Sequence, residues 1–472
     1  MEGQLIMDKR HVQLVKVPEP LRDCSGKPVP LTDDTIQERL DKVLDGMRRR
    51  GLDQLVIYCD VEHSGNFNYL AGFFTRFEES LLIVNSDGEL HFVLGNENLN
   101  KASKARIAVE QDGVVHAPLF SLPNQPDVVG KTLREMLSDA GVVPGSRVGA
   151  VGWKMFTSPH QDADASIDLP AFIVDELRCI IGSDGLLVNA ADIFIGEGGA
   201  RTTNNANELA HYEFGASLAS DCVLDAMDSI EPGVTELELG DKLVRYGQHT
   251  SVVTIAASGP RFEKANMFPT DNMVKLGDPI ALTVGYSGGL SSRSAYAVSC
   301  AEDLPSGCSD YIERVAAPYF HAYAHWLETI HVGMEGGELF NEIERVLPRS
   351  DYGWSLCPGH LTAEEEWLSS PVYEGSVETL RSGMLFQIDI IPSVSGYGGA
   401  NAESTVALAD RALREEIAWE YPAFWSRVVQ RRAYIQDVLG IDLSEDVLPM
   451  CGTVAYLRPY LLAKDKALVL RK

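Results

Sequence analysis

Two histidines have a spacing that suits metal binding from one face of a helix. His321 and His325 stand four residues apart in the run YFHAYAHW, and this spacing places both imidazoles on the same side of a helix. The run lacks an acidic residue at the spacing of the HExxH zinc motif. Tyr319, Tyr323 and Trp326 favour a packed amphipathic helix instead, so we expect no metal site there.

Sequence motifs for several other chemistries are absent. The eight cysteines are scattered without a CxxC pair, which argues against a zinc knuckle or a thioredoxin-type site. The sequence contains no GxGxxG, Walker loop or GxSxG. The run SGGLSSRS (287–294) is rich in Gly and Ser but lacks the lysine and the following helix of a phosphate loop, so we interpret it as a hairpin turn.

Composition narrows the choice of partners. The 472 residues include 68 acidic and 40 basic side chains, a formal net charge of −28. A field of this sign repels phosphate backbones and anionic lipids, so we expect no nucleic-acid and no membrane partner. No run approaches the ~18 apolar residues of a membrane span, and the first twenty residues lack the apolar region of a signal peptide. We therefore expect a cytoplasmic protein of roughly two to four domains.

Strands alternate with helices up to about residue 195, which indicates an α/β domain. Apolar residues recur at helical spacing over 36–47, and Gly51 follows as a C-cap. Strands are predicted at 54–58, at 81–85 and 90–94 across an Asp-Gly turn, and at 147–152, with a helix at 131–141.

Helix pairs alternate with strand pairs after residue 195, which favours an α+β domain over a parallel sheet. Helices are predicted over 207–230, 235–248, 309–330, 336–347 and 411–439. Strands are predicted at 251–258, 279–286, 294–300, 383–392 and 402–409.

Six segments of this second half, in order, resemble the creatinase/aminopeptidase P superfamily, whose fold is called pita-bread and which includes prolidase. They are NELAHY (207–212), SGPRFEKANMFPTDN (258–272), LGDPIALTVGYSGGLSSRSAY (276–296), PGHLTAEEEW (358–367), SGMLFQIDIIP (382–392) and NAESTVAL (401–408). The segment NYLAGFFTRFEESLLIVNSDGE (68–89) is similar to the creatinase-type N-terminal domain. The resemblance covers about residues 35–410. It implies an α+β pita-bread C-terminal domain preceded by an α/β creatinase-like N-terminal domain.

The resemblance also implies a division of the chain. We expect an irregular N-terminal arm (1–34), a creatinase-like domain (35–195), a pita-bread domain (196–410) and a helical C-terminal extension (411–472) packed on it. Proteins of this kind form dimers, so we expect a homodimer.

Metallopeptidases of the superfamily hold two divalent cations with two Asp, one His and two Glu. The resemblance places the following residues at these five positions, in order: Thr283, Arg293 (or Ser292, if the alignment moves by one residue), His360, Asp389 and Glu403. Without the two aspartates the anionic bridge between the cations is lost, and an arginine would add a fixed positive charge. The three retained ligands, His360, Asp389 and Glu403, could still hold one weak metal but not the family's pair, and we expect no metal and no other cofactor.

The second family mechanism, which uses a histidine as proton shuttle without metal, also matches only in part. Asn266 stands where the family has that histidine, and an amide takes up no proton near neutral pH. A later His–Glu position of the family falls around Trp367 and Leu368. The three glutamates at 364–366 are interpreted as a solvated loop.

The retained residues suggest acid–base chemistry. We expect His360 to act as the acid and base, with Asp389 or Glu403 as its partner or as the activator of water. Arg293 is expected to bind a substrate carboxylate or a developing anion. Further substrate-binding residues are expected at Thr283, Asn266 and Arg76, the last from a neighbouring subunit unless it is only a surface charge.

The sequence thus predicts a metal-independent, creatinase-like hydrolase that acts on a C–N bond of a small amino-acid-derived substrate. Two alternatives stay open. One is a non-catalytic binding protein of the same fold. The other is a metal-dependent Xaa-Pro aminopeptidase or prolidase-like peptidase.

Overall fold

The computed structural model describes residues 11–263 and 268–471, and it divides the chain into two compact units. One unit is continuous and spans residues 31–203. The other combines residues 1–30 with residues 204–472. The N-terminal segment therefore belongs to the same unit as the C-terminal half of the chain.

The continuous unit opens with α1 (Asp33–Arg50), whose ends carry the expected signals. The Thr32 side chain accepts a hydrogen bond from the backbone N–H of Thr35, and Gly51 closes the helix in the left-handed conformation at φ 61°. Asp33 and Asp34 in the first turn, and three arginines in the last, match the helix dipole. The helix predicted from its apolar spacing is confirmed.

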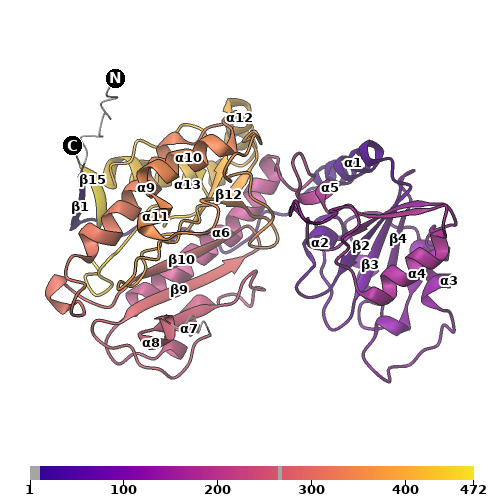
Figure 1. Cartoon of the computed structure of the whole chain (residues 1–472), viewed down its shortest axis with the longest axis horizontal. Coiled ribbons are helices and arrows are strands. Elements are labelled where there is room, and N and C mark those ends of the chain that lie inside the picture. Colours follow the sequence, from indigo (N-terminus) through magenta and orange to yellow (C-terminus); the bar gives the residue numbers. More distant parts are fainter. Residues whose placement is uncertain (1–10, 264–267, 472) are drawn as a thin grey trace. The chain divides into compact units, whose positions relative to one another are not determined.

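A mixed six-stranded sheet forms the centre of this unit (Figure 1). Its order is β5-β4-β3-β2-β6-β7, with β2 antiparallel to β3 and parallel to β6. Every residue of β2 and β3 is buried, because α3 and α4 pack with the sheet in one apolar core and α2 contacts β2. The remaining bounds are β2 (Gln54–Cys59), α2 (Gly65–Ala71), β3 (Ser80–Asn85), β4 (Leu90–Leu94), β5 (Val114–His116), α3 (Leu133–Asp139), β6 (Arg147–Val151), α4 (Ala171–Ile181), β7 (Leu186–Asn189) and α5 (Asp192–Ile195).

The other unit is built on a long helix and an antiparallel sheet. Helix α6 (Ala206–Asp228) is buried over almost its whole length and packs on β9 (Pro279–Tyr286) and β10 (Gly289–Tyr296). Strand β8 (Ile255–Ser258) pairs with β9 on its other side. Only Ser287 and Gly288 form the β9–β10 turn, so the prediction that the whole run 287–294 is a turn is wrong.

Gly288 makes this tight turn possible. Its φ of 103° lies in the left-handed region, and a Cβ at this position would collide with the backbone of Tyr212. The turn sets the register in which Ser292 of β10 lies opposite Thr283 of β9.

A second antiparallel sheet has the order β11-β12-β13-β14. Its strands are β11 (His360–Leu361), β12 (Leu385–Gln387), β13 (Thr405–Leu408) and β14 (Val447–Pro449). The helices of this unit besides α6 are α7 (Glu236–Leu243), α8 (Pro260–Glu263), α9 (Ala317–Thr329), α10 (Gly336–Val346), α11 (Arg349–Tyr352), α12 (Arg411–Glu420) and α13 (Pro422–Ala433).

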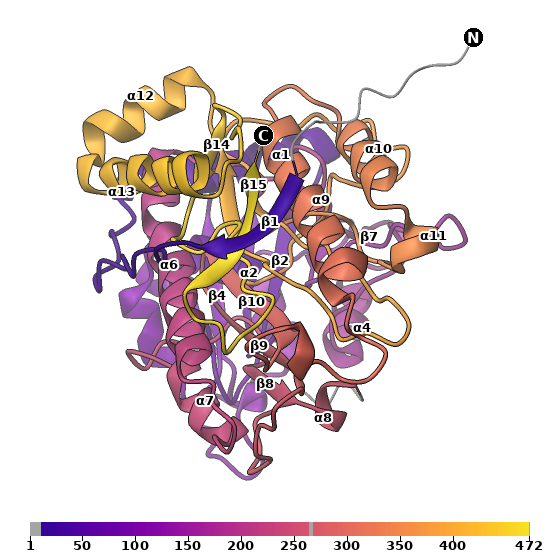
Figure 2. The same cartoon turned by 90° about the vertical axis from the view of Figure 1, so that its left-hand side faces the viewer.

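The two ends of the chain meet in a two-stranded sheet (Figure 2). Strand β1 (His11–Lys16) runs antiparallel to β15 (Lys466–Arg471), so the prediction of an irregular arm is wrong for these residues. The extension after residue 410, predicted as helical, contains α12 and α13 but also β14 and β15. No helix in the described part of the chain is long and apolar enough to cross a membrane.

Candidate active site

A pocket of about 450 Å³ is lined by residues of the β8–β10 sheet and by residues in and beside the β11–β14 sheet of the discontinuous unit. It has an acidic side, a side of neutral polar groups, and apolar walls. The lining residues are Val252, Ile255, Thr283, Leu290, Ser292, Leu356, Glu366, Trp367, Asp389, Ile391, Asn401 and Glu403. None of them is a lysine or an arginine.

His360 lies at the bottom of this region and is completely buried. It is the first residue of β11 and pairs with Gln387 of β12, which fixes its backbone. The indole of Trp367 stacks on its ring with the centroids 4.0 Å apart. Its Nδ1 lies 3.2 Å from the carbonyl oxygen of Leu361, where an N–H donates, so the tautomer leaves the lone pair on Nε2.

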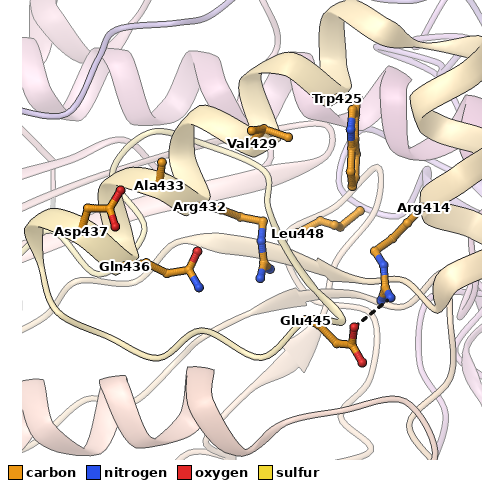
Figure 3. A pocket seen from close by; sticks show the side chains of 9 residues that line it. All are labelled: Arg414, Trp425, Val429, Arg432, Ala433, Gln436, Asp437, Glu445 and Leu448. Atoms are coloured by element: carbon orange, nitrogen blue, oxygen red, sulfur yellow. Dashed lines mark hydrogen bonds and ion pairs between the residues drawn. The ribbon is translucent and has the colours of Figure 1, made fainter.

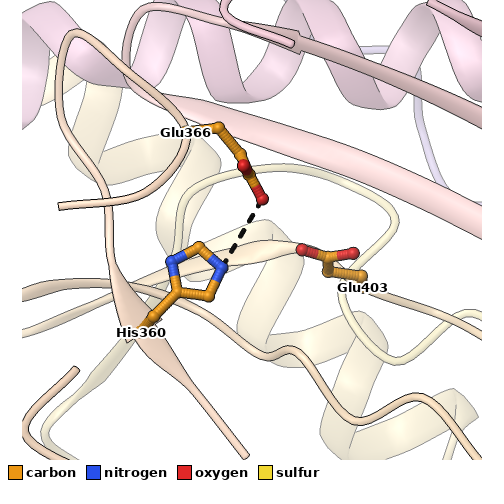
Figure 4. A group of neighbouring side chains, drawn as sticks. All are labelled: His360, Glu366 and Glu403. Carbon is orange, nitrogen blue, oxygen red and sulfur yellow. Dashed lines mark ion pairs between the residues drawn. The ribbon is translucent and has the colours of Figure 1, made fainter. Parts of the chain in front are cut away.

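Three carboxyl groups surround the His360 Nε2 atom. The Glu366 Oε1 is 3.6 Å away and the Asp389 Oδ2 is 4.0 Å away. Ligand atoms of His360, Glu366 and Glu403 all lie within 4.8 Å of one another (Figure 4). Asp389 follows β12 and Glu403 precedes β13, so two neighbouring strands deliver their acids to one point.

Several polar atoms in this group have no hydrogen-bond partner within the described residues. They are Nε2 of His360, Oδ1 of Asp389 and Oε1 of Glu403, all on residues that are at most 5% exposed. Buried polar atoms are almost always paired, and unpaired ones mark strain, catalysis or a bound ion or ligand.

The electrostatics of the group follow mainly from burial, and neighbouring carboxyl groups add to the effect. Burial raises the pKa of Asp389 to about 7, and the nearby Glu366 adds to the shift. Burial, followed by the charges of Asp389 and Glu366, holds the pKa of Glu403 well above its ordinary range. Burial also raises the pKa of Glu366 and lowers the pKa of His360 to about 4, so the imidazole is neutral near pH 7.

Opposite the acids, three neutral polar side chains form a hydrogen-bonded row. Thr283 Oγ1 and Ser292 Oγ are 2.7 Å apart across the β9–β10 pair. The side-chain amide of Asn401 donates to Ser292 Oγ at 3.1 Å. Its oxygen in turn accepts the backbone N–H of Glu403 at 2.8 Å, which couples this row to the acidic side.

Arg293 lies on the other face of β10 and points away from the pocket. Its guanidinium donates to the carbonyl oxygens of Ser292, Glu403, Thr453 and Tyr456 and to the Ser404 hydroxyl. Successive side chains of a strand point to opposite faces, so Ser292 occupies the pocket position and Arg293 cannot. The structure therefore places Ser292, the alternative considered from the sequence, in the pocket lining, and not Arg293.

The other predicted site residues fall into three groups. Thr283, His360, Asp389 and Glu403 are brought together in the pocket region. Arg76 is exposed in the loop between α2 and β3 of the continuous unit, and its predicted role toward a neighbouring subunit stays a prediction. Asn266 lies outside the described residues.

Glu366 is the site residue that the sequence interpretation missed. It was grouped with a solvated loop, but its side chain is only 26% exposed and contacts His360. A signal was available, because Glu366 directly precedes Trp367, near which a His–Glu position of the superfamily falls. An acid beside that position could have been considered as a site residue.

A second pocket, of about 330 Å³, lies along α13 in the C-terminal region (Figure 3). Its two arginines are already engaged. Arg414 contacts Glu445 at 3.4 Å and Asp446 at 2.6 Å, and Arg432 donates to the carbonyl oxygens of Ser444 and Val447. Its lining includes no histidine, so the first pocket is the better candidate for chemistry.

Comparison with known proteins agrees with this geometry. Residues 211–410 match the family model of metallopeptidase family M24. The matched segment lies in the discontinuous unit, which has the pita-bread fold. No curated protein matches the sequence.

Solved structures of the pita-bread fold resemble this chain over most of its length. A dipeptidase from Mycobacterium ulcerans has a TM-score of 0.61 at 18% identity and covers 80% of this chain and 94% of its own. A prolidase from Pyrococcus horikoshii gives 0.60 at 17%, with coverages of 79% and 95%. An Xaa-Pro dipeptidase from Bacillus anthracis gives 0.59 at 17%, with 79% and 94%. These likenesses establish the fold, with its creatinase-like N-terminal domain and pita-bread C-terminal domain.

Proposed function

We propose that this protein is a hydrolase that cleaves a C–N bond of a small amino-acid-derived substrate in the pocket lined by Glu366, Asp389 and Glu403. The observation that carries the proposal is the convergence of three carboxyl groups on the Nε2 atom of a buried histidine. Clusters of titratable groups in a cleft mark catalytic sites more often than other surfaces.

The pocket does not fit the pair of cations used by the superfamily's metallopeptidases. A two-cation centre needs anionic bridges that offset the charges and hold the ions close together. Thr283 and Ser292 present neutral hydroxyls instead, and these are hydrogen-bonded to each other. The metal independence predicted from the sequence stays a prediction, and the neutral hydroxyls argue only against the two-cation centre.

The acidic side of the pocket suits the activation of water, and the neutral polar side suits the binding of a substrate oxygen during C–N cleavage. The carboxylate of Asp389 accepts a proton from a water molecule that attacks the substrate. Of the Thr283 and Ser292 hydroxyls, one donates to the other, so one hydroxyl hydrogen is left to donate to a substrate oxygen. Leu290, Leu356 and Ile391 add apolar walls to the pocket.

The groups proposed to bind the substrate differ from those expected from the sequence. Arg293 is committed to backbone carbonyls, so it is not the group that binds a substrate carboxylate. We propose that selection rests on the hydroxyl and amide row and on the apolar walls. Amides and peptide-like bonds satisfy these groups without a buried cationic partner.

Turnover assays on a substrate panel test the proposal. The panel contains N-acyl amino acids, guanidino acids and Xaa-Pro dipeptides, the last because solved structures of this fold are named as prolidases and Xaa-Pro dipeptidases. We expect turnover of at least one class, and a loss of about 10²–10⁴-fold in kcat in Asp389→Asn. Glu420→Gln, an exposed change on α12, is the matched control and should keep full activity.

The proposal would be overturned if a panel compound binds in the pocket of folded protein and no compound of the panel is turned over. That outcome would favour the non-catalytic binding protein that the sequence left open.

A further inference from the structure

We infer that the floor of this pocket binds one divalent cation through His360, Glu366 and Glu403. Glu366 is not among the five ligand positions of the superfamily, so this would be a single-ion centre of different composition. The inference deepens the proposed function because it concerns the same pocket, but it does not depend on turnover.

The distances suit an ion held by small side-chain movements. The ligand atoms of the three residues lie within 4.8 Å of one another. Nitrogen and oxygen ligands bind a divalent cation at about 2.1 Å, which places them about 3–4 Å apart around it. Rotations that move each atom by about an ångström therefore close the group on one ion.

The orientation of His360 supports the same conclusion. Its Nδ1–H is directed at the Leu361 carbonyl oxygen, and its Nε2 has no hydrogen-bond partner among the described residues. Metal-bound histidines almost always donate their second ring N–H to a backbone carbonyl or a carboxylate, which fixes the ring toward the ion. The completely buried ring is further held by the stacked Trp367.

The charges around the group call for a cation. Glu366, Asp389 and Glu403 bring three carboxyl groups into one buried region, and no lysine or arginine lines the pocket. Arg293 of β10 donates its hydrogen bonds to backbone carbonyl oxygens and to the Ser404 hydroxyl, and not to these carboxyl groups. Buried carboxylates are normally paired or bound to metal, so one divalent ion would stabilise the ionised form of these groups.

The fourth ligand position has a candidate in place. Asp389 Oδ2 lies 4.0 Å from the same Nε2 atom, on the side of the pocket where Glu403 also lies. One imidazole with two or three carboxylates suits Mn²⁺, Zn²⁺ or Co²⁺ better than Ca²⁺ or a thiolate-seeking ion. A second ion finds only the neutral hydroxyls of Thr283 and Ser292.

Binding stoichiometry tests this inference without using activity. The full chain is stripped with a chelator and dialysed, and Mn²⁺ binding is measured by calorimetry and by elemental analysis after gel filtration. We expect one equivalent in the wild type. Glu366→Gln should weaken binding about tenfold or more, whereas Glu365→Gln, in the same loop, should leave it unchanged.

A gain-of-site variant tests the reason for a single ion. The double substitution Thr283→Asp and Ser292→Asp restores two acids on the facing strands, and we expect it to bind a second equivalent. Circular dichroism and melting confirm folding of each variant, and the Glu366→Gln comparison stands alone if the double variant is unfolded.

The results separate this inference from the proposed function. No bound ion in the wild type, two ions in the wild type, or unchanged affinity in Glu366→Gln would each overturn the single-ion centre. Turnover by protein without ion would leave the hydrolase proposal intact while the inference fails. One bound equivalent with no turnover of any substrate would leave the inference intact while the hydrolase proposal fails.

Discussion

At the scale of single residues, two neighbours on β10 have opposite roles. Ser292 faces the pocket, and Arg293 joins β10 to the residues before β13 and to the C-terminal segment at Thr453 and Tyr456. The carbonyl oxygens that Arg293 binds would lose buried donors if the guanidinium were removed. Arg293 is thus a structural residue of the pita-bread domain.

Arg293→Met should therefore lower the free energy of unfolding by about 3–5 kcal/mol. Urea unfolding followed by fluorescence measures this loss. Arg411→Met, which removes only an exposed pair with Glu415, should change stability by less than about 0.5 kcal/mol. If Arg293→Met instead kept its stability and lost substrate affinity, the side chain would face the pocket and this assignment would be wrong.

Asp221 on α6 gives a pH prediction away from the pocket. Burial raises its pKa to about 6, and its Oδ1 has no hydrogen-bond partner among the described residues. The folded state therefore prefers the protonated carboxyl. This contribution to stability is complete below the unfolded pKa of about 4 and is lost as the pH rises through about 6.

Asp221→Asn should thus be more stable than the wild type at pH 7.5 and not at pH 4. Linkage sets the upper limit of the difference at about 3 kcal/mol. The asparagine oxygen can still accept the backbone N–H of Cys24, which Asp221 binds at 3.2 Å. Urea unfolding of both proteins at four pH values checks this, and a difference that does not vary with pH would contradict it.

Sequence reasoning found part of the site and missed part of it for physical reasons. His360, Asp389 and Glu403 stand in recognisable segments, and the structure brings them together. Whether Ser292 or Arg293 faces the pocket depends on the length of the β9–β10 turn. One residue more or less in the turn moves every side chain of β10 to the other face of the sheet. The position of Glu366 beside His360 depends on the conformation of the loop between β11 and β12, and no local sequence pattern indicates that conformation.

At the scale of elements, local signals predicted helices better than strand pairing. The caps of α1 and the apolar runs of β2, β3 and β4 depend only on residues that are close together in the sequence. The partner of β1 is β15, at the opposite end of the chain, and β14 joins β13 across two helices. Such pairings are set by tertiary packing, so the sequence showed neither.

Removal of residues 441–472 should therefore prevent folding of the discontinuous unit. The deletion takes away β14, β15 and two acceptors of Arg293, Thr453 and Tyr456. It also exposes apolar surface on α6, against which Tyr456, Leu461 and Ala467 pack. We expect aggregated protein in gel filtration. A soluble, monodisperse and cooperatively unfolding product would contradict the packing of this extension.

At the scale of the whole molecule, the two units differ in how the chain builds them. Residues 31–203 form one continuous unit with its own sheet and core. The other unit needs residues from before and after this stretch, since β1 pairs with β15 and Asp23 binds Arg431 at 2.7 Å. The order of motifs predicted both fold classes, but it did not predict that the N-terminal arm completes the C-terminal unit.

Separate expression of the two parts tests this difference. Residues 31–203 should fold alone and unfold cooperatively, because their sheet is complete. Residues 204–472 without 1–30 should be destabilised, because β15 loses its partner strand β1 and the buried Arg431 loses Asp23. A peptide of residues 1–30 added to this fragment should raise its melting temperature. No rise on addition of the peptide would contradict the account.

The pocket of the pita-bread domain is expected to hold a single cation rather than a pair. Anomalous diffraction from crystals of the full chain grown with Mn²⁺ tests it most directly. The account predicts one anomalous peak, bounded by His360 Nε2 and the carboxylates of Glu366 and Glu403. Two peaks, with the second beside Thr283 and Ser292, or no peak at this position in protein saturated with Mn²⁺, would contradict it.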